Sequence, residues 1–257
     1  MEIIYQTGFI ITIFLLVIIL HKWIGKYPDP LPGSDNKGKE TLVTLIIWSV
    51  AVLLPIFRIF LLDSWLKEFI SDRFLYELAY CPVALIAYCL IPGYIILKRD
   101  KRSLSDLGIR WKTKSVSVVI FALSLGFLSG IIAYSTGQSV ISDDPISAGT
   151  LLLLLINNDF AEEFFHRGII QSKLERLFGQ QKAIIFGGIL FGLTHIAFDI
   201  TQLLDTGIIF VFFAFLLQTM LGWLLGIIFI KTRSLWPGIV LHFLVNWLPS
   251  ILGGLFG

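Results

Sequence analysis

The chain has 257 residues, of which 56% are hydrophobic and only 15% are charged. Together with a mean hydropathy of +0.85, this composition excludes an ordinary soluble domain and indicates a polytopic membrane protein. The net charge of +2 is close to balance, so it does not indicate nucleic acid as a partner.

Eight apolar stretches follow one another along the chain, and their lengths suit single bilayer crossings. They cover residues 3–20, 41–62, 74–97, 116–136, 148–177, 183–198, 207–230 and 236–252. We therefore expect an all-α fold, a polytopic membrane helix bundle of about eight transmembrane helices. The bundle would be a single integral membrane domain, with three spans and a basic loop in residues 1–115 and a core of five spans in residues 116–257.

The fifth stretch is the longest, and residues 148–177 are expected to form one helix that runs past a charged cluster. At about 1.5 Å per residue, this helix is longer than the hydrocarbon core of a bilayer is thick. Its end at Lys173 and Arg176 should therefore protrude into the headgroups. The carboxylates of the cluster would then lie within the membrane, nearer that end.

Basic residues are concentrated in alternate loops. Sixteen of the twenty lysines and arginines lie in the loops after spans one, three, five and seven, if Lys173 and Arg176 at the end of the fifth span are counted with its loop. The other loops hold only Lys67 and Arg73. By the positive-inside rule, the basic loops are cytoplasmic and both termini lie outside.

The charged cluster of the fifth stretch reads N-N-D-F-A-E-E-F-F-H-R-G over residues 157–168. Ionisable groups are costly in hydrocarbon, so their presence here indicates a function. Arg167 follows Glu163 by four residues, the spacing of an intrahelical ion pair, and His166 follows Glu162 at the same interval. We expect Arg167 to neutralise Glu163 and to leave Glu162 for other work.

Two later stretches carry further polar residues. His195 lies in the sixth, while His242 and Asn246 lie four residues apart on one face of the last. Counted from the cytoplasmic ends of their helices, Glu162, His242 and Asn246 have depths of roughly 9 to 15 Å. We expect the side chains of Glu162, His195, His242 and Asn246 to share a polar cavity in the cytoplasmic half of the membrane.

Two kinds of chemistry suit such a set. A carboxylate and an imidazole that converge on one water form a general base, and a second imidazole with an amide can donate hydrogen bonds to a developing oxyanion. Hydrolysis of an amide bond needs both functions. Alternatively, Glu162, His195 and His242 could bind zinc and leave an open position for water. The residues alone do not decide between a water activated by side chains and a zinc-bound water.

These residues form three motifs, in order, on three apolar stretches: E-E-x-x-x-R (Glu162, Glu163, Arg167), F-x-x-x-H (Phe191, His195) and H-x-x-x-N (His242, Asn246). Over about residues 151–249, the chain resembles the CPBP family of intramembrane proteases. That family includes the CAAX prenyl endopeptidases, which act on prenylated proteins. It also includes bacterial proteins linked to bacteriocin processing or self-immunity, often labelled Abi.

The resemblance implies a role for each motif residue. Glu162 would act with His195 to activate water, His242 and Asn246 would stabilise the oxyanion, and Glu163 and Arg167 would support the site. The core of five spans would then be catalytic. The family was first described as metalloproteases, and a glutamate-type mechanism was later favoured for the prenyl endopeptidases. We accordingly expect no cofactor, with zinc as the alternative.

The expected function is that of an intramembrane endopeptidase whose site opens toward the cytoplasmic leaflet, in the plasma membrane of a bacterium or archaeon. Its partners would be membrane lipid and a protein or peptide substrate: a lipidated C-terminus, a bacteriocin-type leader or a membrane protein. A non-catalytic immunity or scaffold protein is the main alternative. An ion-coupled transporter is less favoured, because no internal repeat relates the two halves of the chain.

Several further residues have open roles. Asn157, Asn158 and Asp159 either line a water cavity or cap a break in the helix, and His166 is expected to pack at the interface rather than to act directly. Glycine pairs at 126 and 130, 188 and 192, and 222 and 226 allow close helix approach. We expect this packing within the chain rather than between copies of it.

Overall fold

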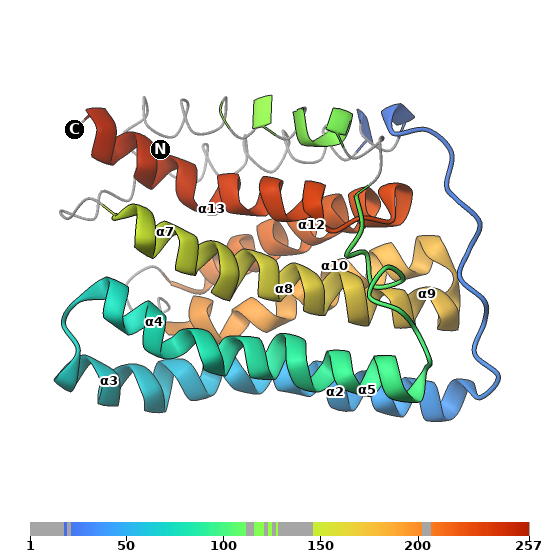
Figure 1. Cartoon of the computed structure of the whole chain (residues 1–257), viewed down its shortest axis with the longest axis horizontal. Coiled ribbons are helices and arrows are strands. Elements are labelled where there is room, and N and C mark those ends of the chain that lie inside the picture. The colour runs from blue at the N-terminus through green and yellow to red at the C-terminus, as the bar shows by residue number, and fades with distance from the viewer. Residues whose placement is uncertain are drawn as a thin grey trace.

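The computed structural model describes residues 18–19, 22–111, 116–120, 123–124, 127, 146–201 and 207–256 (Figure 1). Within these ranges the chain forms helices, turns and loops, and no strand. The predicted first span (3–20) falls almost wholly outside the described residues and the predicted fourth span (116–136) falls outside them for the most part, so both stay predictions. The long helices that are described run side by side along one axis (Figure 1).

Two antiparallel helices form one side of the bundle. The first joins α2 (Lys37–Phe57), a π-helical turn η1 (Arg58–Leu62) and α3 (Asp63–Phe69), and the second joins α4 (Arg73–Ala84), a π-helical turn η2 (Leu85–Leu90) and α5 (Ile91–Arg99). Asn36 and Asp72 cap the two N-termini by accepting a backbone N–H three residues on. The first helix ends at Phe69, beyond the predicted end of its span at residue 62.

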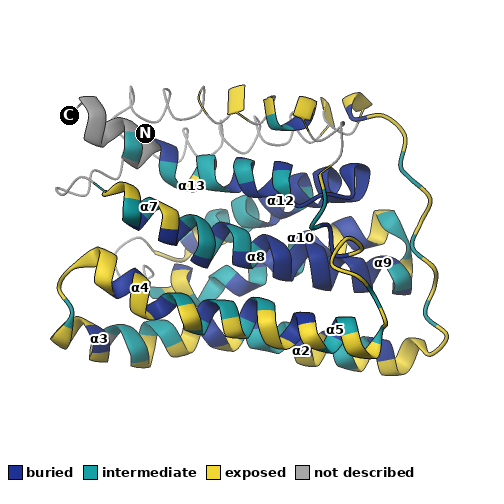
Figure 2. Cartoon of the chain, in the orientation of Figure 1, coloured by how far each residue is buried: buried dark blue, intermediate teal, exposed yellow. Residues whose placement is uncertain are grey.

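One continuous helix crosses the middle of the bundle, as the sequence predicted. It joins α7 (Ala148–Leu154), η3 (Leu155–Phe160), α8 (Ala161–Glu163), η4 (Phe164–Gln171) and α9 (Ser172–Phe178). Two π-helical segments, η3 and η4, flank Glu162 and Glu163, and such segments often occur at functional sites. The helix ends at Gly179, whose φ of +83° suits glycine. Figure 2 shows that its second half is almost entirely buried.

Three more helices complete the described bundle: α10 (Gln180–Thr201), α12 (Ile208–Thr232) and α13 (Trp236–Phe256). By length and hydropathy, four helices of the described chain can each cross a membrane, over Lys37–Phe69, Arg73–Arg99, Gln180–Thr201 and Ile208–Thr232. The central helix is too polar for its composition alone to indicate a membrane span. The apolar part of α13 that the structure describes, Trp236–Leu248, is shorter than these four helices. The fold is thus all-helical, and the predicted number of about eight spans is not reached among these residues.

Helices α10 and α12 pack through two of the predicted glycine pairs. A Cβ atom added at Gly222 would lie 2.7 Å from the Cα of Gly188, and one at Gly192 would lie 3.1 Å from the backbone oxygen of Phe215. Close backbone approach is what small residues in membrane helices permit. These two pairs therefore serve packing within the chain, as predicted, and residues 126 and 130 lie outside the described residues.

Buried ion pairs close the end of the bundle where the basic loops lie. Lys173 is fully buried, with its Nζ 2.6 Å from Glu40 Oε1 and 2.9 Å from Asp100 Oδ2. Arg233 Nη1 lies 2.5 Å from Glu175 Oε2. Lys173 thus lies inside the protein at this helix end, surrounded by acidic groups from two other helix ends, and the protrusion of this end into the headgroups stays a prediction.

The loop before α2 adds a further layer to this closed end. The backbone N–H of Leu31 donates to Glu175 Oε1 at 3.0 Å, and Arg233 donates to the backbone oxygen of Asp29 at 3.1 Å. The loop after α5 is attached in the same way, since Leu235 N–H donates to Gly108 O at 3.0 Å. Contacts among the described residues therefore close the basic end of the bundle.

The glycine contact between α10 and α12 predicts a stability defect. Gly222→Ala should destabilise the protein by about 1–3 kcal/mol, because the added methyl group meets backbone that cannot rotate away. Gly38→Ala is the matched control, since a Cβ at that helical position comes no closer than 3.8 Å to a neighbour. Thermal unfolding of the purified protein in detergent measures both, and equal melting temperatures for the two variants would contradict the packing argument.

Candidate active site

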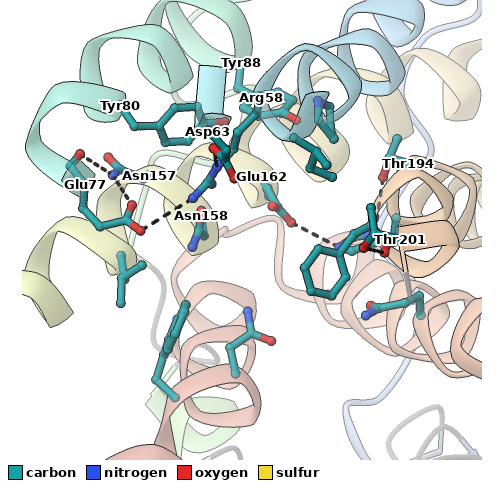
Figure 3. Close-up of a pocket in the computed structure, with 18 of the residues that line it drawn as sticks. Arg58, Asp63, Glu77, Tyr80, Tyr88, Asn157, Asn158, Glu162, Thr194 and Thr201 are labelled. Carbon is teal, nitrogen blue, oxygen red and sulfur yellow. Dashed lines mark hydrogen bonds and ion pairs between the residues drawn. The ribbon is translucent and has the colours of Figure 1, made fainter. Parts of the chain in front are cut away.

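A cavity of about 760 Å³ lies between α2–α3, α4, the central helix, α10 and α13 (Figure 3). Three of the four predicted catalytic residues line it, namely Glu162, His195 and Asn246. Glu162 projects from α8 and His195 from the second half of α10, so two helices bring together residues that lie 33 positions apart. The predicted convergence of these side chains on one polar cavity is therefore observed for three residues.

Glu162 and His195 face each other across this cavity. The Nε2 of His195 lies 3.8 Å from Glu162 Oε2, and each side chain is 22% exposed. The His195 Nδ1 lies 2.9 Å from the backbone oxygen of Phe191, which can only accept a hydrogen bond. Nδ1 must therefore carry the proton, so that a neutral His195 presents the lone pair of Nε2 toward Glu162.

Glu162 Oε2 and His195 Nε2 are then two hydrogen-bond acceptors that face each other with no donor between them. Their separation of 3.8 Å is too long for a direct hydrogen bond, yet a single water can donate one proton to each. A water held between a carboxylate and an imidazole is polarised by two bases at once. The pair can therefore activate water.

Glu163 points into the protein interior and has different partners. Its Oε2 lies 3.3 Å from Arg167 Nε, and its Oε1 lies 3.2 Å from His242 Nδ1, with all three side chains at most 2% exposed. The guanidinium of Arg167 also lies 4.5 Å from the centre of the Phe191 ring. Arg167 pairs with Glu163, as their spacing predicted.

The structure places His242 behind the cavity rather than on its wall. Its ring faces Glu163 and packs 5.7 Å from the Phe191 ring, and only 2% of the residue is exposed. The sequence grouped His242 with Asn246 because both share a helix face. Both side chains do face the central helix, but His242 contacts Glu163 there, whereas Asn246 contacts Asp159.

Asn246 is exposed on the cavity wall and is held from behind by a buried carboxylate. Its Nδ2 donates to Asp159 Oδ1 at 2.9 Å, and the indole N–H of Trp247 donates to Asp159 Oδ2 at 3.1 Å. Asp159 is fully buried. Its neighbours Asn157 and Asn158 line the cavity, and the helix continues through them, so they do not cap a break.

His166 lies at the inner wall of the cavity, among aromatic rings. Its ring centre lies 5.2 Å from that of Phe165 and 5.0 Å from that of Phe191. Only 3% of the residue is exposed, so it packs inside the bundle and not at the membrane interface as predicted. The reason is that η4 directs this face of the helix toward α10.

Sequence reasoning missed a charged group on the opposite wall. The guanidinium of Arg58 lies 4.1 Å from the centre of the Tyr80 ring and 3.6 Å from both Asp63 and Glu77 (Figure 3). Glu77 also accepts from the Nδ2 of Asn157. The sequence does show Arg58 and Glu77 as charged residues within apolar stretches, but it does not show which side chains they contact.

The cavity extends in a direction that the sequence did not predict. Its wall includes Asp63, Lys67 and Arg73 at the α3–α4 connection and Thr201 at the end of α10. The basic loops lie at the opposite, closed end. The cavity therefore extends toward the end of the bundle away from the basic loops, and the side of the membrane that it faces stays a prediction.

The three candidate zinc ligands do not form one site. His242 is directed at Glu163, whereas Glu162 and His195 face the cavity. In the part of the chain that the structure describes, no group of three histidine, cysteine, aspartate or glutamate side chains is placed to hold a metal ion. This donor arrangement does not fit the open tetrahedral zinc site of a hydrolase.

The buried pair of Glu163 and Arg167 predicts a test of stability. Arg167→Met should destabilise the protein by about 3–5 kcal/mol, because Glu163 loses its only guanidinium partner while remaining buried. The double variant Glu163→Gln/Arg167→Met should recover a large part of this loss. Lys39→Met removes an exposed cation as the control. Thermal unfolding in detergent decides, and a single variant as stable as this control would refute the pairing argument.

Comparison with known proteins agrees with the motifs. Residues 145–248 match the family model described as type II CAAX prenyl endopeptidase Rce1-like. Searches of curated proteins and of solved structures gave no match. The matched segment holds all three motifs together with the central helix, α10 and most of the described α12 and α13. Over residues 145–248, the resemblance of this chain to the CPBP family of CAAX prenyl endopeptidases is therefore confirmed.

Proposed function

We propose that this protein is an intramembrane endopeptidase in which Glu162 and His195 activate the attacking water. The observation that carries the proposal is the 3.8 Å separation of Glu162 Oε2 and His195 Nε2 on the wall of a cavity, within the segment that matches an endopeptidase family. Both groups accept hydrogen bonds, and a shared water satisfies both.

The reaction begins when this water attacks the carbonyl carbon of the scissile peptide bond. As the C–O bond forms, the water passes one proton to the Glu162–His195 pair, and the carbonyl oxygen becomes an oxyanion. Asn246, on the cavity wall, donates an N–H to that oxyanion. The C–N bond then breaks, and the leaving amine takes the proton back from the pair.

The remaining motif residues support this step from the interior. Glu163 and Arg167 hold the central helix by a buried ion pair, and His242 is placed to orient Glu163. The resemblance implied that His242 also stabilises the oxyanion, but its position behind the cavity favours the supporting role. We propose a metal-free mechanism, since these side chains do not converge as zinc ligands.

We propose a protein or peptide substrate that lies in or beside the membrane. A lipidated, CAAX-type C-terminus is the first candidate, because the matched family is described as prenyl endopeptidases. A bacteriocin-type leader and a membrane protein are the other candidates from the motif resemblance. The cavity of about 760 Å³ accommodates a short extended peptide.

The catalytic proposal is tested by cleavage of a panel of prenylated and unprenylated reporter peptides. Glu162→Gln and His195→Ala should each lower kcat by about 100-fold or more, because the amide of Gln cannot take a proton from the attacking water and Ala removes the imidazole. Glu68→Gln, which neutralises an exposed carboxylate on α3, should leave the rate unchanged. A chelator should not change the wild-type rate.

Three results would contradict this proposal. Undiminished cleavage by Glu162→Gln would remove the assigned base. Loss of activity on chelation, with recovery on adding zinc, would replace the metal-free mechanism. No cleavage of any peptide in the panel would favour the non-catalytic immunity or scaffold function, which a biological assay of Glu162→Gln would then support if its effect persisted.

We propose further that the cavity opens toward the outer face of the membrane. The positive-inside rule places the basic loops in the cytoplasm, and the cavity extends to the other end of the bundle. Substrate would then approach from the outer side, near Lys67 and Thr201.

This orientation is tested by labelling single cysteines in intact cells, in a background without Cys81 and Cys89. An impermeant maleimide should label Lys67→Cys directly, and it should label Lys101→Cys only after the membrane is permeabilised. Both positions are exposed, so burial does not bias the comparison. The reverse pattern would place the cavity mouth in the cytoplasm and would overturn the orientation but not the catalytic proposal.

A further inference from the structure

Asp159 is a buried carboxylate next to the catalytic groups that the proposed reaction does not use. It lies on η3, three residues before Glu162, and it is fully buried within the bundle. A carboxylate without partners is very costly in such a place. Its two partners therefore indicate what it does.

Both oxygens of Asp159 accept a hydrogen bond, and both donors come from α13. Asn246 donates to Oδ1 at 2.9 Å, and Trp247 donates to Oδ2 at 3.1 Å. The indole nitrogen is only ever a donor, and it fixes the rotation of the carboxylate. One oxygen then remains for Asn246, in a fixed position.

This contact determines which way the Asn246 amide points. A carboxylate oxygen accepts but does not donate, so the NH₂ group of Asn246 must face Asp159, and the carbonyl oxygen must face away. Asn246 is itself exposed on the cavity wall, and among the described residues only Asp159 forms a hydrogen bond with its amide. Without Asp159, the two orientations of the amide would differ little in energy.

We infer that Asp159 is a positioning residue that fixes the Asn246 amide so that its second N–H is presented to the oxyanion. This inference rests on the proposed function, because it assigns a partner to the oxyanion donor. Preorganised donors contribute to catalysis only when their direction is fixed before the reaction. The buried carboxylate supplies that direction from behind the cavity wall.

Asp159→Asn is the first variant to measure, because it keeps the shape of the side chain and leaves a single acceptor oxygen. If that oxygen stays with Trp247, the new NH₂ group faces Asn246 and turns its amide over. We expect kcat to fall by about 10- to 100-fold with little change in KM, since the donor acts mainly in the transition state. Glu68→Gln again serves as the unaffected control.

Rescue by a second substitution separates positioning from simple structural support. In Asp159→Asn/Trp247→Phe the indole donor is gone, so the remaining oxygen can accept from Asn246 again. We expect at least a 5-fold recovery of kcat relative to Asp159→Asn, with Trp247→Phe measured alongside as the reference. The recovery is expected because no indole N–H then competes with Asn246 for that oxygen.

The exchange variant Asp159→Asn/Asn246→Asp provides the opposite test. Asn at 159 can accept from Trp247 and donate to Asp at 246, so every hydrogen bond of the set is retained. We expect a melting temperature near that of the wild type, but an activity as low as that of Asn246→Ala, because a carboxylate now faces the oxyanion. Restored activity in the exchange variant would show that the two residues serve only as a hydrogen-bonded support, and it would overturn both the positioning inference and the assignment of Asn246 as the oxyanion donor.

The outcomes distinguish this inference from the proposed function. If Asn246→Ala keeps the full rate, the oxyanion assignment itself is wrong. If Asn246→Ala loses activity while Asp159→Asn keeps it, only the positioning inference is overturned. Equal inactivity of Asp159→Asn with and without Trp247→Phe, together with lowered melting temperatures, would also overturn it. A low kcat in Asp159→Asn that Trp247→Phe restores would establish it.

Discussion

Ionised groups buried in an apolar bundle must find their partners inside the protein, and this constraint organises the structure around Glu163. Removing one partner of such a pair is costly, whereas the intact pair is tolerated because each charge is compensated. Arg167 comes from the same helix as Glu163, but His242 comes from α13. Gly238 makes this approach feasible, since a Cβ there would lie 3.0 Å from Glu163 Oε2. The contact between Glu163 and His242 thus helps to fix how α13 lies against the central helix, and with it the position of Asn246.

The two ends of the bundle differ because charged groups are used differently at each. At the basic end, Lys173 forms short ion pairs with Glu40 and Asp100, and Arg233 forms one with Glu175. The loop before α2 packs over these groups. At the other end, Arg58 lies 3.6 Å from its carboxylate partners and over a tyrosine ring. Charge therefore seals one end and lines an opening at the other.

Three carboxylates on less than two turns of one helix have three separate environments. Glu162 reaches the cavity and faces His195, Glu163 is buried against Arg167, and Asp159 is buried against two donors of α13. Adjacent helix residues point about 100° apart, so a short segment can supply a different face to each partner. The π-helical segments η3 and η4 on either side of α8 adjust these directions further. A single charged cluster can in this way hold the site together and also carry its chemistry.

The sequence by itself determined the helical class, the continuous central helix, the pairing of Glu163 with Arg167 and the family resemblance of residues 145–248. These features depend on hydropathy and on spacings within one helix, which are local properties of the chain. Only the tertiary structure decided that His242 turns to Glu163, that Asp159 holds Asn246, that Arg58 points inward and that the cavity extends away from the basic loops. Each of these depends on the angle and depth at which separate helices meet. Hydropathy places a helix in the membrane but does not fix its rotation about its own axis, and that rotation selects the partner of every polar side chain.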